Sequence, residues 1–324
     1  MSTVENLPFR IVDEIPLRLH MWWSDLGEVG QRSVTKALGG LIGLLMIKPM
    51  VDLIEALIPF WDTTHNVFHF SDFELTPMLE EITGYDGYDR GLRHQYRVAP
   101  RAVTPQEVLE LLSINRQVKK ENLAEGYCTF HFLYSWKEKQ VGVAQRFSLH
   151  SRILGTLIFP KEDGHIELGL VGVADFLDKK ANGTLVPMII KEIYRAQPLV
   201  DLKFFEGCNL LLQMWLVEHL CYRPRYMNYG LTRLSFIEEY ENRVSGYELP
   251  EDAEAWFTRL CSLTINQIEW TFSWLSVKEV IYISTDVCFL LLMGLRSIQP
   301  YTPHRVLRQL GRYQMIPHDE DLST

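Results

Sequence analysis

The chain has 324 residues, of which 47% are hydrophobic, and this composition excludes a disordered protein and provides for a large core. Its formal charge of −9 disfavours non-specific binding to a nucleic-acid backbone, although a local basic face remains compatible with that charge. The five cysteines form no CxxC pair and no disulfide spacing, which indicates buried free thiols in a reducing compartment.

The sequence predicts neither a secretory leader nor a membrane span. The N-terminus has early acids and prolines instead of a basic start followed by an apolar run. The most apolar stretch, Ala37 to Ile47, is shorter than the roughly 20 apolar residues that a spanning helix needs. We therefore expect an intracellular, non-secreted protein without membrane association.

The first 60 residues predict an arm followed by two helices. Residues 1–20 mix charges and prolines and are expected to form an N-terminal arm. Helical patterning begins at Arg32 and ends at Pro49, because proline stops or kinks a helix. Apolar residues at helical spacing over 50–60 predict a second, antiparallel helix.

A hairpin and a capped helix are predicted next. PFWD and NVFHF place aromatic and β-branched residues on either side of Thr-Thr-His, a pattern typical of a short hairpin. Thr76 is expected to cap the following helix with Pro77 at its first position. Glu80 and Glu81 would then lie near the positive end of the helix dipole.

The remaining pattern is again mostly helical. Thr104-Pro105 predicts a capped helix start, residues 125–134 fit either a strand or a buried helix, and Asp163-Gly164 predicts a turn. Further helices are expected over 146–159, 185–196, 207–222, 250–263, 286–295 and 303–314, with 185–196 and 207–222 strongly amphipathic.

These elements predict a mainly α, multi-helix globular domain with one or two small β-hairpins. Strands do not alternate with helices as a doubly wound sheet requires. We find no internal repeat or flexible linker, so we expect a single domain over residues 21–317 and a polar tail over 318–324.

The first candidate site lies in the predicted hairpin. His65 and His69, with Asp62, Asp72 and Glu74, are residue types that bind zinc, and they would suit a metal-dependent hydrolase. Two histidines four residues apart suit one face of a helix, however, whereas this stretch has the pattern of a hairpin. We therefore favour a structural hairpin with polar turn residues over a metal site.

The strongest candidate for binding is a basic helix face. Arg305, Arg308 and Arg312 are spaced to share one side of a helix, and Arg296 and His304 add positive charge. Such a face could bind an acidic partner or phosphates, or it could be a solvated surface that makes internal ion pairs.

Two further groups have a structural and a functional interpretation. Glu238, Glu239 and Glu241 around Tyr240 could act as paired acids, but an exposed solvated segment is favoured. Tryptophans at helical spacing are typical of a core, although one of two adjacent tryptophans would face outward. The tryptophans concerned are Trp215, Trp270 and Trp274, and the adjacent pair Trp22 and Trp23.

No motif predicts a cofactor or a catalytic residue. The sequence lacks a GxxxxGK[ST] loop, GxGxxG after a strand, HExxH, GxSxG and zinc-finger spacing. We therefore expect no cofactor, no catalytic residue and no metal ligand.

Several stretches together resemble the plant mobile domain family. They are LIEALIPFWDTTHNVFHFSDFELTPMLEEITGY, SRILGTLIFPKEDGHIEL, IIKEIYRA followed by GCNLLLQMWLVEHL, and PHRVLRQLGRYQMIP. FSDFELTP, FFEGCN and PHRVLRQLG are most similar to a plant branch of domains of unknown function. The resemblance covers about Trp22 to Pro317.

This resemblance implies a mainly helical, nuclear plant domain of transposable-element origin, linked to transposon silencing or genome maintenance through protein interaction. Some relatives are labelled aminotransferase-like, but no Schiff-base lysine or phosphate cradle is visible here. The first hypothesis is thus a non-enzymatic interaction domain with an unidentified protein partner. The alternatives are a nucleic-acid-binding protein and a metal-dependent hydrolase that uses His65, His69 and Asp62.

Overall fold

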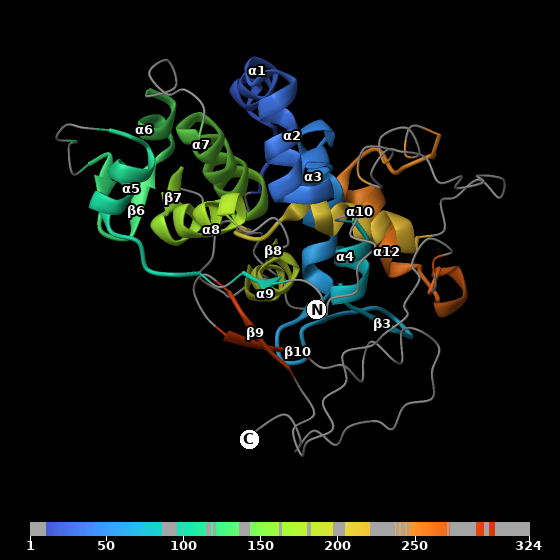
Figure 1. Ribbon diagram of the computed structural model, residues 1–324. Helices are drawn as coiled ribbons and strands as arrows, with labels where there is room; N and C mark the ends of the chain where they lie inside the picture. The colour runs from blue at the N-terminus through green and yellow to red at the C-terminus, as the bar shows by residue number, and fades with distance from the viewer. Residues whose placement is uncertain are drawn as a thin grey trace.

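The computed structural model is mainly helical, which confirms the predicted fold class (Figure 1). It describes residues 11–85, 96–98, 100–114, 118, 121–135, 143–161, 164–179, 183–196, 205–220, 237, 240, 244, 246–270, 272, 290–294 and 298–301. Residues 1–10 and 302–324 lie outside this set, so the boundaries expected for the arm, the single domain and the tail remain predictions.

The N-terminal helices differ in detail from the predicted pattern. They are α1 (Leu17–Asp25), α2 (Gly27–Leu38), the 3-10 helix η1 (Gly39–Met46) and α3 (Val51–Leu57). The α-helix predicted to continue to Pro49 instead ends at Gly39, where φ is 58°. Glycine adopts this left-handed conformation without steric cost, and the chain continues as a 3-10 helix.

The predicted hairpin is confirmed, and a third strand extends it. After the 3-10 turn η2 (Ile58–Phe60), β1 (Trp61–Asp62) pairs with β2 (Val67–His69), and β2 pairs with β3 (Glu74–Leu75), both antiparallel. The turn from β2 to β3 closes with a 2.9 Å hydrogen bond from the Phe70 amide to the Phe73 carbonyl.

Helix α4 (Leu79–Tyr85) begins two residues later than expected, and the predicted cap is wrong. The Thr76 hydroxyl lies 2.9 Å from the carbonyl oxygen of Asn66 instead of binding a helix amide. Glu81 accepts the amide of Met78 at 3.0 Å, so a carboxylate in the first turn satisfies a donor at this helix start.

The middle of the chain forms a second group of helices around a small sheet. The capping box of Thr104 and Glu107 at the start of α5 (Pro105–Leu111) confirms the predicted cap. Residues 125–134 form a strand and then a helix. The strand β6 (Tyr127–Thr129) lies between β5 (Leu123–Ala124) and β7 (His165–Glu167), and it leads into α6 (Phe130–Ser135). Strand β4 (Tyr96–Arg97) pairs in parallel with β8 (Gly183–Thr184). The remaining elements of this group are helical: α7 (Val143–Ile153), the π-helical turn η5 (Leu154–Ile158) and α8 (Leu168–Lys179).

Two central helices are buried along their described length. All residues of α10 (Asn209–His219) are buried, as are most of those of α9 (Val186–Ala196). The predicted amphipathic pattern of α10 is therefore wrong, because neighbouring elements cover the sides that carry its polar residues. In Figure 1, α9 lies between the group of α5 to α8 and the group of α3, α4, α10 and α12.

The last described elements include one clear correction. The predicted helix over 250–263 is confirmed as α12 (Ala253–Cys261), and the 3-10 turn η6 (Ile265–Gln267) follows it. The predicted helix over 286–295 is wrong, since β9 (Leu290–Met293) pairs there with β10 (Ile298–Tyr301). A short apolar run carries no periodicity that separates a strand from a helix. The helix expected over 303–314 lies outside the described residues.

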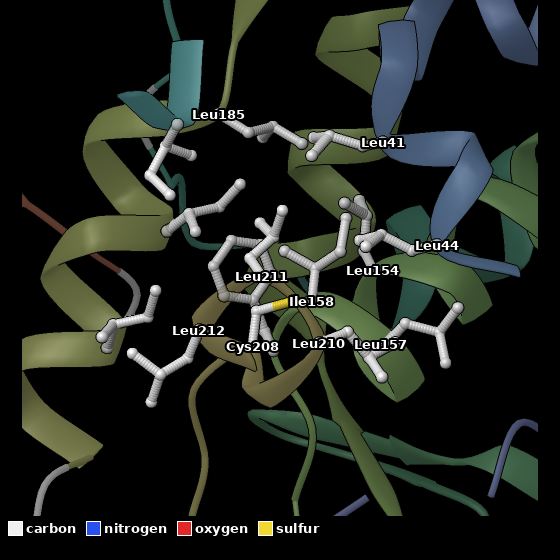
Figure 2. Close-up of a cluster of buried hydrophobic side chains, with 14 of the residues drawn as sticks. Leu41, Leu44, Leu154, Leu157, Ile158, Leu185, Cys208, Leu210, Leu211 and Leu212 are labelled. Carbon is white, nitrogen blue, oxygen red and sulfur yellow. The ribbon is translucent and has the colours of Figure 1, made fainter. Parts of the chain in front are cut away.

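An apolar core joins η1, η5 and α10 (Figure 2). The side chains labelled there are each at most 2% exposed: Leu41, Leu44, Leu154, Leu157, Ile158, Leu185, Cys208, Leu210, Leu211 and Leu212. Cys208 and Cys128 are buried free thiols, as predicted, whereas Cys261 is exposed. Burial raises the pKa of the Cys208 thiol to about 12, so this thiol is protonated at neutral pH. Among the described residues, the helices are all too short or too polar to cross a membrane.

Leu211→Ala tests this core. Its side chain is fully buried, so truncation should lower the free energy of unfolding by about 2–5 kcal/mol through lost transfer energy and a cavity. Urea unfolding followed by circular dichroism measures the loss. The matched control is Leu17→Ala, because Leu17 is 72% exposed on α1. Equal losses for the two variants would contradict the assigned core.

Candidate functional site: an aromatic surface row held by a buried polar cluster

The histidines and carboxylates considered as metal ligands form a polar turn in the hairpin, the interpretation that the sequence favours. Nδ1 of His65 lies 2.6 Å from Asp62 Oδ2, while Asp62 Oδ1 accepts the amides of Thr64 and His65. Burial alone would raise the pKa of Asp62, but these hydrogen bonds hold it below its ordinary value. His69 lies opposite Glu74 on the neighbouring strand. Within the described ranges, no three His, Cys, Asp or Glu side chains are grouped to hold a metal ion.

The other sequence-predicted residues have mixed outcomes. Trp215 is fully buried, which confirms it as core, and Trp22 is buried while Trp23 is half-buried. Trp270 is half-buried at the surface. The predicted interaction face and the acid cluster lie outside the described residues and stay predictions, as does the interpretation of Trp274: Arg305, Arg308, Arg312, Glu238, Glu239 and Glu241.

A cluster of polar and aromatic side chains is buried where α4, α9, α10 and β10 meet. We call it the buried polar cluster, and each of its members is at most 7% exposed. Its members are Glu80, Glu81, Lys191, Glu192, Tyr194, Trp215, His219 and Tyr301. The sequence predicts Glu80 and Glu81 in the first turn of a helix, but no local pattern predicts that both carboxylates are buried.

Glu81 and His219 form the centre of the cluster. Oε1 of Glu81 lies 2.9 Å from Nε2 of His219, and Oε2 accepts the indole N–H of Trp215 at 2.9 Å. Nδ1 of His219 lies 2.8 Å from the carbonyl oxygen of Glu269, which can only accept, so Nδ1 carries a proton.

A chain of ion pairs extends along α9. Nζ of Lys191 lies 2.8 Å from one oxygen of Glu192, whose other oxygen accepts Nε of Arg195 at 2.9 Å. Arg195 also pairs with Glu206. A Cβ at Gly294 would overlap the side chain of Lys191. The backbone just after β9 therefore packs directly against the Lys191–Glu192 ion pair, at a distance that only glycine permits.

Glu80 is held on the other side of α4. Its Oε2 accepts the hydroxyl of Tyr301 at 3.1 Å, and that hydroxyl accepts the amide of Leu79 at 3.2 Å. Burial raises the pKa of the Glu80 carboxyl, and the negative charge of Glu81 adds to the rise, against the hydrogen bonds from its own amide and from Tyr301. Burial also raises the pKa of Tyr301 well above its ordinary value.

The buried polar cluster fixes a surface segment. His219 binds Glu269 twice, since its carbonyl accepts the Glu269 amide at 2.9 Å and its Nδ1 donates to the Glu269 carbonyl. The next residue is Trp270, whose indole N–H donates to the carbonyl of Ile265 at 3.1 Å. The amide of Ile265 in turn donates to Asp72, at the tip of the β2–β3 turn, at 3.2 Å.

Five aromatic side chains form a continuous row at this surface, which we call the aromatic row. It runs through Phe257, Phe60, Phe70, Phe73 and Trp270. Successive ring centroids are 5.6, 5.1, 4.7 and 5.8 Å apart, the spacing of favourable aromatic pairs. Phe70 and Phe73 are buried in the middle, whereas Phe257 is 43% exposed at one end.

Carboxylates lie on the elements that carry the ends of the aromatic row. Glu254 lies one turn before Phe257 on α12, Glu55 lies on α3 against which α12 packs, and Glu269 adjoins Trp270. Burial, and then the negative charge of Asp52, raise the pKa of the Glu55 carboxyl. The row therefore combines apolar aromatic surface with negative charge.

Most of the chain matches one known protein family. The family described as a domain of unknown function, DUF7745, matches residues 20–324. The chain belongs to the DUF7745 family. The match includes every described element from α2 onward, and so the buried polar cluster and the aromatic row belong to the DUF7745 region. No curated protein and no solved structure matches the chain.

Glu81→Ala tests the centre of the cluster. The change removes the acceptor for His219, Trp215 and the Met78 amide, so the free energy of unfolding should fall by about 3–5 kcal/mol. Chemical denaturation measures it. Glu28→Ala is the control, because Glu28 pairs with Arg32 on the exposed side of α2 and should matter little. A loss no larger than that of the control would contradict the cluster's structural role.

Glu80→Gln tests the raised pKa of Glu80. A carboxyl whose folded pKa exceeds the ordinary value of 4.5 contributes most stability below pH 4.5, and this is lost as pH rises through the folded pKa. The stability of Glu80→Gln relative to wild type should therefore increase as pH rises above 4.5, because glutamine stays neutral and still accepts from Tyr301. Urea unfolding at a series of pH values measures this difference. A difference that stays constant with pH would contradict the assignment.

Proposed function

We propose that this DUF7745 protein is a non-enzymatic protein-interaction domain of transposable-element origin that acts in the plant nucleus. The motifs that resemble the plant mobile domain family support the origin and the location, through FSDFELTP, FFEGCN and PHRVLRQLG. An interaction domain of this kind would contribute to transposon silencing or genome maintenance by binding a protein partner.

The aromatic row is the observation that carries the interaction function. Phe257 and Ile265 are 43% and 45% exposed, and both lie beside half-buried Phe60 or Trp270. An exposed aromatic side chain that packs on further aromatic rings is typical of protein-binding surfaces, where such anchors supply most of the affinity. Single exposed leucines are common on protein surfaces and do not by themselves indicate a binding site.

We further propose that Arg305, Arg308 and Arg312 form a second contact face. Their spacing supports this assignment, since it places three guanidinium groups along one side of a helix. Guanidinium groups bind carboxylates in pairs of hydrogen bonds, so this face would take an acidic segment of a partner. We propose one domain over residues 21–317, so that both faces belong to the same body.

Capture of the tagged chain from plant nuclei, followed by mass spectrometry, tests the function. A specific partner should be retained by wild type and reduced at least several-fold by Phe257→Ser combined with Ile265→Ser, because both remove exposed apolar contact. Val29→Ser is the matched control, since Val29 is 75% exposed on α2. Arg305→Glu with Arg308→Glu and Arg312→Glu separately tests the basic face.

Two outcomes would overturn the proposal. One is a partner set that is the same for every variant, which would place binding elsewhere on the chain. The other is tight binding to duplex DNA that falls steeply with salt, which would favour the nucleic-acid alternative.

A further inference from the structure

The sequence segments that build the aromatic row are strongly acidic. The sequence segments 48–75 and 246–270, which build the row and its supports, contain ten Asp or Glu and two Lys or Arg. They are Asp52, Glu55, Asp62, Asp72, Glu74, Glu248, Glu251, Asp252, Glu254 and Glu269, against Lys48 and Arg259. Their net charge of −8 accounts for most of the −9 of the whole chain.

Part of this negative charge lies on the two helices next to Phe257 and Phe60. Glu254 precedes Phe257 by three residues on α12 and therefore shares its side of the helix. Glu55 and Asp52 are exposed on α3, which packs against α12 and leads directly into Phe60. An occupant of the row would thus contact aromatic faces and carboxylates at the same time.

We propose that the solvent-accessible rings at the two ends of the aromatic row, Phe257 and Trp270, bind an arginine-rich segment of a protein partner. This inference rests on the proposed interaction function and names the chemistry of its partner. A guanidinium group stacks on an aromatic ring and at the same time pairs with a neighbouring carboxylate, which matches both features of this surface. The aliphatic part of the arginine side chain covers apolar area beside Ile265.

Other occupants fit the surface less well. The phosphates of nucleic acid and of anionic lipid headgroups would be repelled by the carboxylates around the row. A second copy of the chain would place the same acidic surface against itself in a symmetric dimer. An acidic peptide meets the same repulsion, so a cationic partner is the one that the charge favours.

The row is also held in place before any partner arrives. His219 holds Glu269 through both of its backbone groups, and Asp72 holds Ile265, so two independent anchors fix the segment that carries Trp270. A preorganised surface loses little conformational entropy on binding, which favours a short extended peptide.

Fluorescence anisotropy with dye-labelled twelve-residue peptides tests the inference. The probes alternate glycine or serine with arginine, with lysine or with glutamate, at a series of salt concentrations. The arginine peptide should bind the wild-type chain more tightly than the lysine peptide does, and the glutamate peptide should not bind. Glu55→Gln with Glu254→Gln should weaken binding and reduce its dependence on salt.

The decisive variant changes no charge. Phe257→Ser should weaken binding of the arginine peptide at least tenfold, whereas Val29→Ser, an exposed apolar residue on α2, should leave it unchanged. Circular dichroism of both variants checks that the fold is kept. Equal affinities for wild type and Phe257→Ser would show attraction by net charge alone and overturn the inference.

The outcome separates this inference from the proposed function. If nuclear capture depends on Phe257 and Ile265 but the arginine peptide does not bind, the interaction function stands and the partner chemistry is wrong. If the arginine peptide binds through Phe257, the partner chemistry stands, and the search for the natural partner is restricted to proteins with exposed arginine-rich segments.

Discussion

The carboxylate of Glu81 and the imidazole of His219 meet at 2.9 Å with neither side chain exposed to solvent, and three parts of the protein depend on this contact. Glu81 also binds the Met78 amide at the start of α4 and the indole of Trp215 on α10. Through Nδ1, His219 holds the Glu269 carbonyl. A buried polar group is tolerated only when its partners are in place, so α4, α10 and the segment before Trp270 have to assemble together.

The buried polar cluster and the apolar core contribute to the fold in different ways. Apolar side chains such as Leu154 and Leu211 stabilise the fold through the hydrophobic effect, which has no directional requirement. Other well-packed arrangements of similar volume would bury them equally well. Lys191 and Glu192 are equally buried, but their charges require particular partners at particular positions. We interpret the cluster as the part of the interior that fixes how α9 and α10 are oriented.

The surface function follows from this interior. The ring centroid of Phe68 on β2 lies 5.6 Å from that of Trp215. The sheet whose β2–β3 turn carries Phe70 and Phe73 therefore packs on α10, the helix that also contributes to the buried polar cluster. The row reaches solvent at Phe257 on α12, which packs against α3, and at Trp270, whose segment is bound by His219 of α10 and by Asp72 of the β2–β3 turn. Aromatic area that is fixed in this way and carried by acidic segments is suited to binding a cationic segment rather than a phosphate backbone.

The sequence by itself determined the helical class, the β1–β2 hairpin, the capped start at Thr104 and the buried thiols Cys128 and Cys208, because each depends on local spacing or on composition. Only the tertiary structure decided that residues 290–293 form a strand, that Thr76 does not cap α4 and that α10 is buried on all sides. It also decided the candidate site. Glu81, His219 and Glu269 are separated by 138 and 50 residues, and the rings of Phe60 and Phe257 by almost 200. Contacts over such separations arise from packing, which no local pattern of residues encodes.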